Sequence, residues 1–391
     1  MPLAEQRSRA TAATVKVYRK GTHRARFPEE TWDIIEPKLT RFGITRIADV
    51  TGLDTIGIPV ALGIRPLARS LSVSQGKGQT STLAKVSAAM ESIELWHAEH
   101  AYPPVIAHRV PGYELALPYS VVDLDMLPGS LVGDGTPLDW VAACGLTTGR
   151  TVPVPLDMVC LTPPGREAWT PVGFRRTSNG LASGNCREEA ALHALYEVVE
   201  RDAILGEPWE DEPDYVQPES VTDAGCAAML ARLRSSGVVF DIAHVANRFR
   251  VPCFAARIWS EDLPITCLGF GAHLDPNVAL SRAVTEAAQG RLTAIAGSRE
   301  DLPPVYEQVR EGGDERPRPV PGGSTWAEVI ADLASDCADL ADELATVSAI
   351  VAGVAGSEPL LVDLSTDDEF FVVKVLVPGT ASDLDRLHQE G

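Results

Sequence analysis

The amino-acid sequence predicts a mixed α+β protein built from repeated units of strand, turn, strand and helix. Three segments share one loose pattern, in which a β-rich run ends in Asp and a turn leads into a second β-rich run. Helices are predicted before the second and third of these segments, at 223–235 and 325–347, and this alternation indicates an α+β architecture. The strand-pair segments are 44–64, 238–258 and 359–378.

Composition restricts the class of protein. With 45% hydrophobic and 23% charged residues among 391, the chain has the composition of a globular protein and not of a disordered one. No stretch reaches 18 apolar residues and the N-terminus lacks the apolar core of a signal peptide, so we expect a cytoplasmic protein without a membrane partner. Seven scattered cysteines without a C-x-x-C pair predict reduced thiols and no zinc or disulfide framework.

Charge is unevenly distributed along the chain. The formal net charge of −20 would repel nucleic-acid phosphates, so no nucleic-acid partner is expected, and an enzyme or a partner-binding protein is favoured. Residues 1–26 hold seven Lys and Arg against one Glu and are interpreted as a basic N-terminal arm. Residues 301–325 are charged, rich in Pro and Gly and without periodicity, which predicts a surface loop.

Three further predicted helices carry acidic side chains where a buried helix would have apolar ones. They cover 83–99, 187–205 and 279–297, and each has a stripe of polar residues three and four positions apart on one face. Apolar residues occupy nearly every other side, as in a buried helix. The stripes consist of Ser87, Glu91 and Glu94; of Glu189, His193, Glu197 and Glu200; and of Arg282, Glu286, Gln289 and Thr293.

Buried carboxylates need a source of positive charge. An ionised carboxylate without a partner costs several kcal/mol to bury. The three stripes would be satisfied together if they faced one another around divalent cations, and carboxylate oxygens suit Mg²⁺, which also bridges to phosphates. The alternative is that each stripe lies on a narrow solvated face of an amphipathic helix, the common situation for a single Glu. Spacing alone leaves both interpretations open.

Glycine-rich segments precede the first two acidic helices. SQGKGQT (74–80) places two glycines around Lys77, and SNGLASGN (178–185) supplies further glycines and an Asn. Free backbone N–H groups at a helix start, together with a Lys, suit phosphate oxygens, so both segments are candidate phosphate-binding entries. Neither matches the G-x-x-x-x-G-K-[ST] loop, and plain turns are the alternative.

Taken together, these motifs resemble the YcaO family. The resemblance rests on SQGKGQT with SAAMESIE, on SNGLASGNCREEA with YEVVERDA, and on HLDPNVALSRAVTEAAQGR, and it extends to GTHRARFPEETW, GITRIADVTGLDTIGIPV and VVKVLVPG. It implies one catalytic domain over residues 1–391 with a YcaO-like fold around a central nucleotide and Mg²⁺ site. Members of that family use ATP and Mg²⁺ to phosphorylate a backbone amide oxygen of a peptide, after which a nucleophile attacks the activated carbon. The products are azolines, thioamides or amidines.

The resemblance also implies roles for individual residues. The implied metal ligands are Glu91, Glu94, Glu197, Glu200 and Glu286. The implied nucleotide contacts are Lys77, Ser87, Asn185, Glu189 and Gln289, with Arg24 as a further candidate. Arg201 and Arg291 are the implied catalytic residues, since a guanidinium can stabilise charge on the transferring phosphoryl group.

The resemblance further implies a precursor peptide as substrate and a homodimer, although two features depart from it. Leu95 follows Glu94 where the family often has Arg, and the chain ends in ASDLDRLHQEG where the azoline-forming branch commonly has a proline-rich tail. No leader-binding domain is expected before residue 21, so a leader-binding or sulfur-supplying partner protein is one expectation. Two other functions stay open: a catalytically silent peptide-binding scaffold, and a ligase of the ATP-grasp kind that joins a carboxylate to an amine.

Overall fold

Three similar units form the framework of the computed structural model. Each unit has an antiparallel strand pair, a third strand beside it, and a long helix that follows the third strand in the sequence. The strand pairs are the three predicted from the sequence, so that prediction and the α+β class are confirmed. The structure describes residues 15–162, 172–206, 209–210, 213–299, 305–317, 322–331, 333, 337–366 and 369–381.

The first unit contains the first acidic helix. β1 (Arg46–Asp49) pairs with β2 (Val60–Ile64), and β2 pairs with β3 (Val73–Lys77). The helix α3 (Ser81–His100) follows β3 and begins where the Thr80 side chain accepts a hydrogen bond from a backbone N–H of the first turn. The chain therefore runs from the third strand directly into the acidic helix.

The second unit joins two distant parts of the chain. β12 (Leu360–Asp363) pairs with β13 (Phe371–Leu376), and β13 pairs with β7 (Leu181–Gly184). The second acidic helix, α4 (Arg187–Gly206), follows β7. The C-terminal strand pair thus completes the sheet on which α4 packs.

The third unit is continuous in the sequence. β9 (Val239–His244) pairs with β10 (Cys253–Trp259), and β10 pairs with β11 (Cys267–Ala272). The third acidic helix, α6 (Pro276–Ala296), follows β11, and the Asp275 carboxylate caps its first turn.

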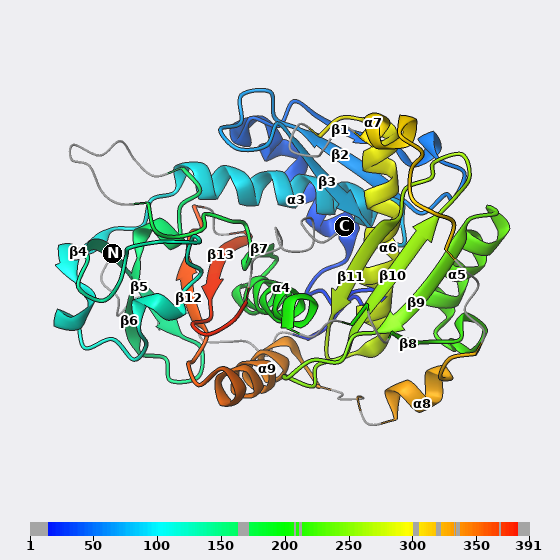
Figure 1. Ribbon diagram of the computed structural model, residues 1–391. Coiled ribbons are helices and arrows are strands. Elements are labelled where there is room, and N and C mark those ends of the chain that lie inside the picture. The colour runs from blue at the N-terminus through cyan, green and yellow to red at the C-terminus, as the bar shows by residue number, and fades with distance from the viewer. Residues whose placement is uncertain are drawn as a thin grey trace.

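The three acidic helices contact one another's units in a cycle. α3 packs on β2 and β3 and also contacts β7 of the second unit, while α4 packs on β7 and β13 and also contacts β11 of the third unit. α6 packs on β10 and β11 and also contacts β3 of the first unit. Figure 1 shows α3, α4 and α6 arranged around the middle of the molecule. This arrangement allows one face of each helix to meet the faces of the other two.

Glycines in the third strands allow the helices to approach the sheets closely. A Cβ atom at Gly76 of β3 would lie 2.0 Å from the backbone nitrogen of Ala88 in α3. The corresponding distances to the backbones of α4 and α6 are 2.4 Å for Gly184 of β7 and 2.1 Å for Gly269 of β11. Any side chain at these positions would push the helix away. Gly76 and Gly184 lie within strands and not in the phosphate-binding turns that the sequence suggested.

Apolar cores cover the remaining faces of the three helices. Ile93 of α3 belongs to a core with Trp140, Leu195 of α4 to a second core with Val375, and Val284 of α6 to a third core that includes other parts of its sheet. The other elements are α2 (Pro28–Ile35), β4 (Val105–Pro111), β5 (Pro137–Gly145), β6 (Thr151–Pro155), β8 (Asp214–Tyr215), α5 (Ala224–Ser235), α7 (Val305–Arg310), α8 (Trp326–Ile330), α9 (Leu340–Ala355) and short 3-10 helices.

Three predictions about connecting segments need correction. The helix predicted over 325–347 is two helices, α8 and α9, each with its own capped N-terminus. The surface loop predicted over 301–325 contains the helix α7, while 301–304 and 318–321 lie outside the described residues. The basic arm predicted over 1–26 lies outside the described residues up to position 14, and from Val15 onward it packs on the rest of the chain. Of the helices in the described ranges, none is both long and apolar enough to cross a membrane.

Candidate active site

Five glutamates from the three acidic helices lie close enough to influence one another's protonation. The charge of Glu197 on α4 acts on both Glu91 and Glu94 of α3, and the charge of Glu286 on α6 acts on Glu200 of α4. These five residues are the metal ligands expected from the sequence. The structure brings them together, and their binding of a metal stays a prediction.

Of the carboxylates on α3, those of Glu91 and Glu94 belong to the cluster and are not fully compensated by the groups around them. Glu91 accepts a hydrogen bond from the backbone N–H of Gln75 at 3.3 Å, and burial raises the pKa of Glu91 from 4.5 to about 7. Glu94 accepts a hydrogen bond from the Ser183 hydroxyl at 2.5 Å, and burial, together with the neighbouring glutamates, raises the pKa of Glu94 to about 8. A carboxylate holds its proton to such high pH when its surroundings do not replace the lost hydration.

The glutamates on α4 and α6 differ in depth and in pKa. Burial raises the pKa of Glu197 and of Glu200, which lie one helical turn apart. Burial would also raise the pKa of Glu286, but its ion-pair partner Lys77, together with the charges of Arg201 and Arg282, outweighs this effect and lowers it. The side chains of Glu197 and Glu286 are 20% and 26% exposed, against 3% for Glu200. Glu197 and Glu286 therefore retain access to solvent, and Glu200 lies deeper.

Two guanidinium groups stand near the glutamates without a close hydrogen bond to them. Nη2 of Arg201 is 4.0 Å from Oε1 of Glu197, and Nη2 of Arg282 is 3.9 Å from Oε2 of Glu200. Both distances exceed the 2.7–3.2 Å range typical of a hydrogen bond. These guanidinium groups keep donors for an anion such as a phosphate, which suits the role predicted for Arg201.

A histidine on α4 is influenced by several cationic side chains near the glutamates. Burial, followed by the charges of Arg282, Arg24 and Lys77, lowers the pKa of His193 well below 6.5 and keeps it neutral. Arg282 is on the predicted polar stripe of α6, but no role was predicted for it. The charge of Arg299, which lies beyond the predicted end of that helix, acts on Glu91 and was not anticipated either.

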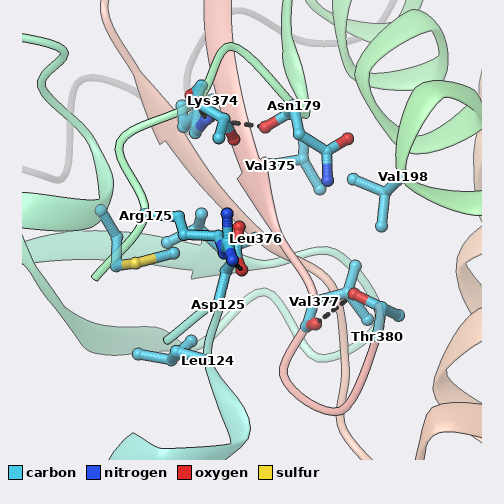
Figure 2. A pocket seen from close by; sticks show the side chains of 12 residues that line it. Leu124, Asp125, Arg175, Asn179, Val198, Lys374, Val375, Leu376, Val377 and Thr380 are labelled. Carbon is cyan, nitrogen blue, oxygen red and sulfur yellow. Dashed lines mark hydrogen bonds and ion pairs between the residues drawn. The ribbon is translucent and has the colours of Figure 1, made fainter. Parts of the chain in front are cut away.

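Lys374 on β13 is a site residue that sequence reasoning missed. Its buried ammonium donates to the carbonyl oxygens of Thr177 and Asn179 at 2.7 and 2.6 Å. Burial lowers the pKa of Lys374 to about 8, and the charge of Glu197 acts in the opposite direction. Figure 2 shows Lys374 and Asn179 in a hollow that Val198 of α4 also lines; the five glutamates do not line it. The feature of the sequence that could have revealed this residue is the single lysine inside the apolar strand FVVKVL.

Asn185 and Glu189, both expected to bind nucleotide, meet each other and the N-terminal segment. Glu189 accepts hydrogen bonds from the side chain of Asn185 at 3.0 Å and from the backbone N–H of Ala25 at 2.8 Å. Nε of Arg24 is 3.7 Å from Glu189, and the Thr31 hydroxyl donates to Oδ1 of Asn185 at 2.8 Å. Much of the hydrogen-bonding capacity of these two side chains is therefore used inside the protein.

Gln289 and Ser87 lie next to the glutamates. Nε2 of Gln289 donates to Oε1 of Gln75 at 3.4 Å, and Gln75 is the residue whose backbone reaches Glu91. The Thr293 hydroxyl donates to the same Gln75 oxygen at 2.5 Å. Ser87 is half-buried on α3, one turn before Glu91. Both residues are placed where a nucleotide contact is feasible, and that contact stays a prediction.

Arg291 is placed differently from the other predicted site residues. Its guanidinium is buried, forms an ion pair with Asp54 at 3.0 Å, donates to the Ser260 hydroxyl at 2.6 Å and lies 3.4 Å from Asp262. Arg291 follows Glu286 by five positions on α6, so the two side chains point about 140° apart around the helix axis. These are the contacts of a structural ion pair, so the catalytic role predicted for Arg291 gains no support from its position.

The donor set of the cluster fits Mg²⁺ bound to a polyphosphate. Mg²⁺ takes oxygen ligands and is commonly held by a few carboxylates together with substrate phosphates. Burial raises the pKa of four of the five glutamates although Arg and Lys side chains stand nearby, and divalent cations would supply the further positive charge that favours their ionised form. Arg201, Arg282 and Lys77 provide donors suited to phosphate oxygens.

Known proteins share this sequence and fold. Residues 75–381 match the family model of the YcaO cyclodehydratases, described as ATP- and Mg²⁺-binding. An uncharacterized protein of Mycobacterium tuberculosis (strain ATCC 25618 / H37Rv) is 41% identical over 379 residues, covering 94% of this chain and 84% of the relative. An uncharacterized protein of Methanothermobacter thermautotrophicus is 35% identical over 374 residues, covering 90% and 93%.

Solved structures agree over nearly the whole chain. The structure of YcaO from Methanopyrus kandleri bound with AMPPCP and Mg²⁺ matches with a TM-score of 0.71 at 27% identity, covering 96% of each chain. A heterocyclase in complex with substrate and cofactor shares the fold, with a TM-score of 0.71 at 21% identity over 95% of this chain and 54% of that one. The chain therefore belongs to the YcaO family and is an ATP- and Mg²⁺-dependent peptide-modifying enzyme.

Proposed function

We propose that this enzyme uses ATP and Mg²⁺ to phosphorylate a backbone amide oxygen in a ribosomally made precursor peptide, acting as one catalytic domain over residues 1–391. The observation that carries the proposal is the cluster of buried and half-buried glutamates from three helices beside guanidinium groups that make no close hydrogen bond to them. Such a cluster is costly to keep in a protein that binds no cation. It suits a metal-bound polyphosphate.

The acidic residues are assigned to the metal. Mg²⁺, when bound, neutralises phosphate charge and helps to align the γ-phosphoryl group. Glu197 and Glu286, which keep access to solvent, are the ligands best placed to meet a nucleotide that enters from solvent. The proposed ligands are Glu91, Glu94, Glu197, Glu200 and Glu286.

The cationic and polar residues are assigned to ATP. Arg201 is the proposed catalytic residue, because a guanidinium beside the metal ligands can stabilise the charge that develops on the transferring phosphoryl group. Lys77 and Arg282 bind phosphate oxygens, since both cations lie beside glutamates of the cluster. The proposed remaining nucleotide contacts are Ser87, Asn185, Glu189 and Gln289.

The reaction then follows from the activated amide. The amide oxygen takes the γ-phosphoryl group and ADP leaves; a nucleophile adds to the amide carbon, and phosphate departs with the former amide oxygen. A Cys, Ser or Thr side chain as nucleophile gives an azoline, a sulfide source gives a thioamide, and an amine gives an amidine. We propose that the enzyme works as a homodimer and that a partner protein supplies leader recognition or sulfur.

Isotope transfer tests the proposal. A precursor peptide encoded beside the gene is synthesised with ¹⁸O at its backbone amides and incubated with enzyme, ATP and Mg²⁺. We expect one ¹⁸O in the released phosphate for each modified amide, and none with Glu91→Gln. Label that reaches phosphate only from a labelled carboxylate would identify a ligase. Peptide binding without formation of ADP under any condition would identify a peptide-binding scaffold.

A further inference from the structure

Residues 15–25, which we call the N-terminal strap, connect a buried ionic cluster to the candidate nucleotide site. At one end, Nζ of Lys16 pairs with Oε2 of Glu343 on α9 at 2.6 Å, and both side chains are almost fully buried. At the other end, the backbone N–H of Ala25 donates to Glu189. The strap therefore spans from α9 to the acidic helix α4.

Glu343 is the centre of the ionic cluster. Its Oε1 accepts a hydrogen bond from the Tyr196 hydroxyl at 2.5 Å and lies 3.2 Å from Nε2 of His273. His23 of the strap stands between two carboxylates, 3.8 Å from Glu343 and 3.5 Å from Asp275. Burial would raise the pKa of Glu343, but these partners and Lys16 lower it. Glu343 is thus ionised and holds two strap residues.

The cluster contains the residue types of a metal site, but the position of the hydrogen on His273 does not suit metal binding. Ligand atoms of His23, His273 and Glu343 lie within 4.8 Å of one another. However, Nδ1 of His273 accepts a hydrogen bond from the backbone N–H of Asp275 at 2.9 Å. In the neutral ring the hydrogen is then on Nε2, which faces Glu343 and has no lone pair for a metal. The Lys16 ammonium already supplies the positive charge that an ion would bring.

The middle of the strap is fixed against two of the acidic helices. Gly21 has a φ of 70°, and a Cβ there would lie 2.4 Å from Nε2 of Gln79 and 2.8 Å from Oγ of Ser281. Gln79 lies just before α3, and Ser281 lies near the start of α6. Three residues later, Arg24 lies 3.7 Å from Glu189, and its charge acts on His193. The strap thus places the guanidinium of Arg24 at the edge of the glutamate cluster.

We propose that Glu343 is a positioning residue for nucleotide binding: it fixes the strap through Lys16 and His23, and the strap holds Arg24 against the nucleotide phosphates. This inference rests on the proposed nucleotide site. Glu343 does not touch ATP in this arrangement; it acts through the strap. Loss of its charge leaves Lys16 buried without a counter-ion, which favours release of the strap.

Binding of Mg²⁺–AMPPCP to the full chain, measured by calorimetry, tests the proposal without turnover. Glu343→Gln should weaken binding about tenfold, the scale typical of coupling between distinct sites. Trypsin should also cleave faster within the strap, after Arg19 or Lys20. Asp342→Asn, at the neighbouring exposed position of α9, should change neither. In turnover assays Glu343→Gln should raise KM for ATP and leave kcat at saturating ATP nearly unchanged.

Further variants separate positioning from general destabilisation. Val347→Ala, at a fully buried position of α9, should lower the melting temperature and keep wild-type nucleotide affinity. If Glu343→Gln does not fold, Gly21→Ala disturbs the strap without touching the ionic cluster and should weaken binding as well. Unchanged affinity in Glu343→Gln or Gly21→Ala, together with a released strap, would overturn the proposal.

Two outcomes distinguish failure of the strap from failure of the site. If Lys77→Met weakens Mg²⁺–AMPPCP binding but Glu343→Gln does not, only the role of the strap is wrong. If Lys77→Met has no effect either, the nucleotide site is wrong. Stoichiometric zinc in the purified protein that His23→Ala removes would overturn the ionic cluster in favour of a metal centre.

Discussion

The middle and the C-terminal end of α3 carry glutamates in opposite electrostatic settings. Near its C-terminus, Glu99 is fully buried, pairs with Nη2 of Arg65 at 2.5 Å and accepts hydrogen bonds from both the backbone and the hydroxyl of Ser70. Burial would raise the pKa of Glu99, but these partners lower it below its ordinary value. One to two turns earlier, burial raises the pKa of Glu91 to about 7 and that of Glu94 to about 8.

This difference distinguishes structural charge from functional charge. Glu99 has all the partners that it needs within the protein, so it can only hold the fold together. Glu91 and Glu94 lack them, so they remain able to bind a cation from solution. The two arginines follow the same rule: Arg291 is saturated by buried partners, while Arg201 stays 4.0 Å from its nearest carboxylate.

Among single substitutions, removal of the partner of Glu99 should produce the largest loss of stability. Arg65→Met leaves a buried carboxylate without its cation, and breaking such a pair costs about 3–5 kcal/mol. Urea unfolding measures the loss. Arg46→Met, at an exposed position of β1, is the matched control and should cost little. A loss below about 1 kcal/mol in Arg65→Met would show that Glu99 is not a structural charge in the sense argued above.

The glutamates in the middle of α3 predict that stability depends on pH. Above pH 4.5 the unfolded chain loses the protons of Glu91 and Glu94, whereas the folded, metal-free chain keeps them up to about pH 7 for Glu91 and about pH 8 for Glu94. The folded state then binds more protons, so its stability falls as pH rises through this window. In EDTA we expect wild type to lose on the order of 6 kcal/mol between pH 5 and 8 relative to Glu91→Gln/Glu94→Gln, because two protons are involved and each costs about 1.4 kcal/mol per pH unit.

Metal and nucleotide should abolish that loss. Mg²⁺–AMPPCP binds the deprotonated carboxylates and stabilises the folded state by mass action, so the stability difference between pH 5 and 8 should shrink or change sign. Unfolding curves at fixed pH, with and without ligand, give the comparison. Equal pH profiles of wild type and the double variant in EDTA would mean that these carboxylates are solvated and not buried acids.

A single substitution in the middle of α3 should separate activity from stability. Glu91→Gln removes a charge that is costly to bury, so the metal-free protein should unfold at the same or a higher temperature. ATP turnover should fall about a hundredfold or more, equivalent to about 3 kcal/mol. Glu114→Gln, at an exposed position, serves as the control. Full turnover with an unchanged Mg²⁺ requirement would remove Glu91 from the metal site.

Local patterns explain which parts were predictable from the sequence. The helices predicted over 83–99, 187–205 and 279–297 are observed at Ser81–His100, Arg187–Gly206 and Pro276–Ala296, because periodicity and capping act within a few residues. The polar stripes on those helices were visible for the same reason. The three strand pairs were visible because each is joined by a short connection in the sequence.

Long-range pairing explains what was not predictable. Lys374 joins the site because β13 pairs with β7, which lies far away in the sequence. The strap meets α4 and α9 through contacts that no local pattern encodes. Arg291 shows the converse: it belongs to a sequence motif with Glu286 and Gln289, yet the helical turn directs it to Asp54 instead. The spacing of residues in a motif shows which way a side chain points only when its angular position around the helix is taken into account.

The smallest effect is expected for Gln289. Its amide donates to the Gln75 side chain at 3.4 Å, and the Gln75 backbone N–H reaches Glu91 at 3.3 Å, so Gln289 is placed to contact the nucleotide or to support this link. Gln289→Ala removes about one neutral hydrogen bond, worth roughly 1 kcal/mol, so KM for ATP should rise about fivefold with little change in kcat.

Steady-state kinetics at varied ATP measures this change, and Gln308→Ala, at an exposed glutamine of α7, should leave both constants unchanged. Arg291→Ala sharpens the contrast on the same helix. Because Arg291 is buried against Asp54 and Ser260, its loss should lower stability while the remaining folded enzyme keeps its KM for ATP. If instead kcat fell in Arg291→Ala while stability stayed unchanged, the Arg291 guanidinium would have to reach the phosphoryl group. The distinction between charges saturated by partners inside the protein and charges available to a ligand would then fail at this helix.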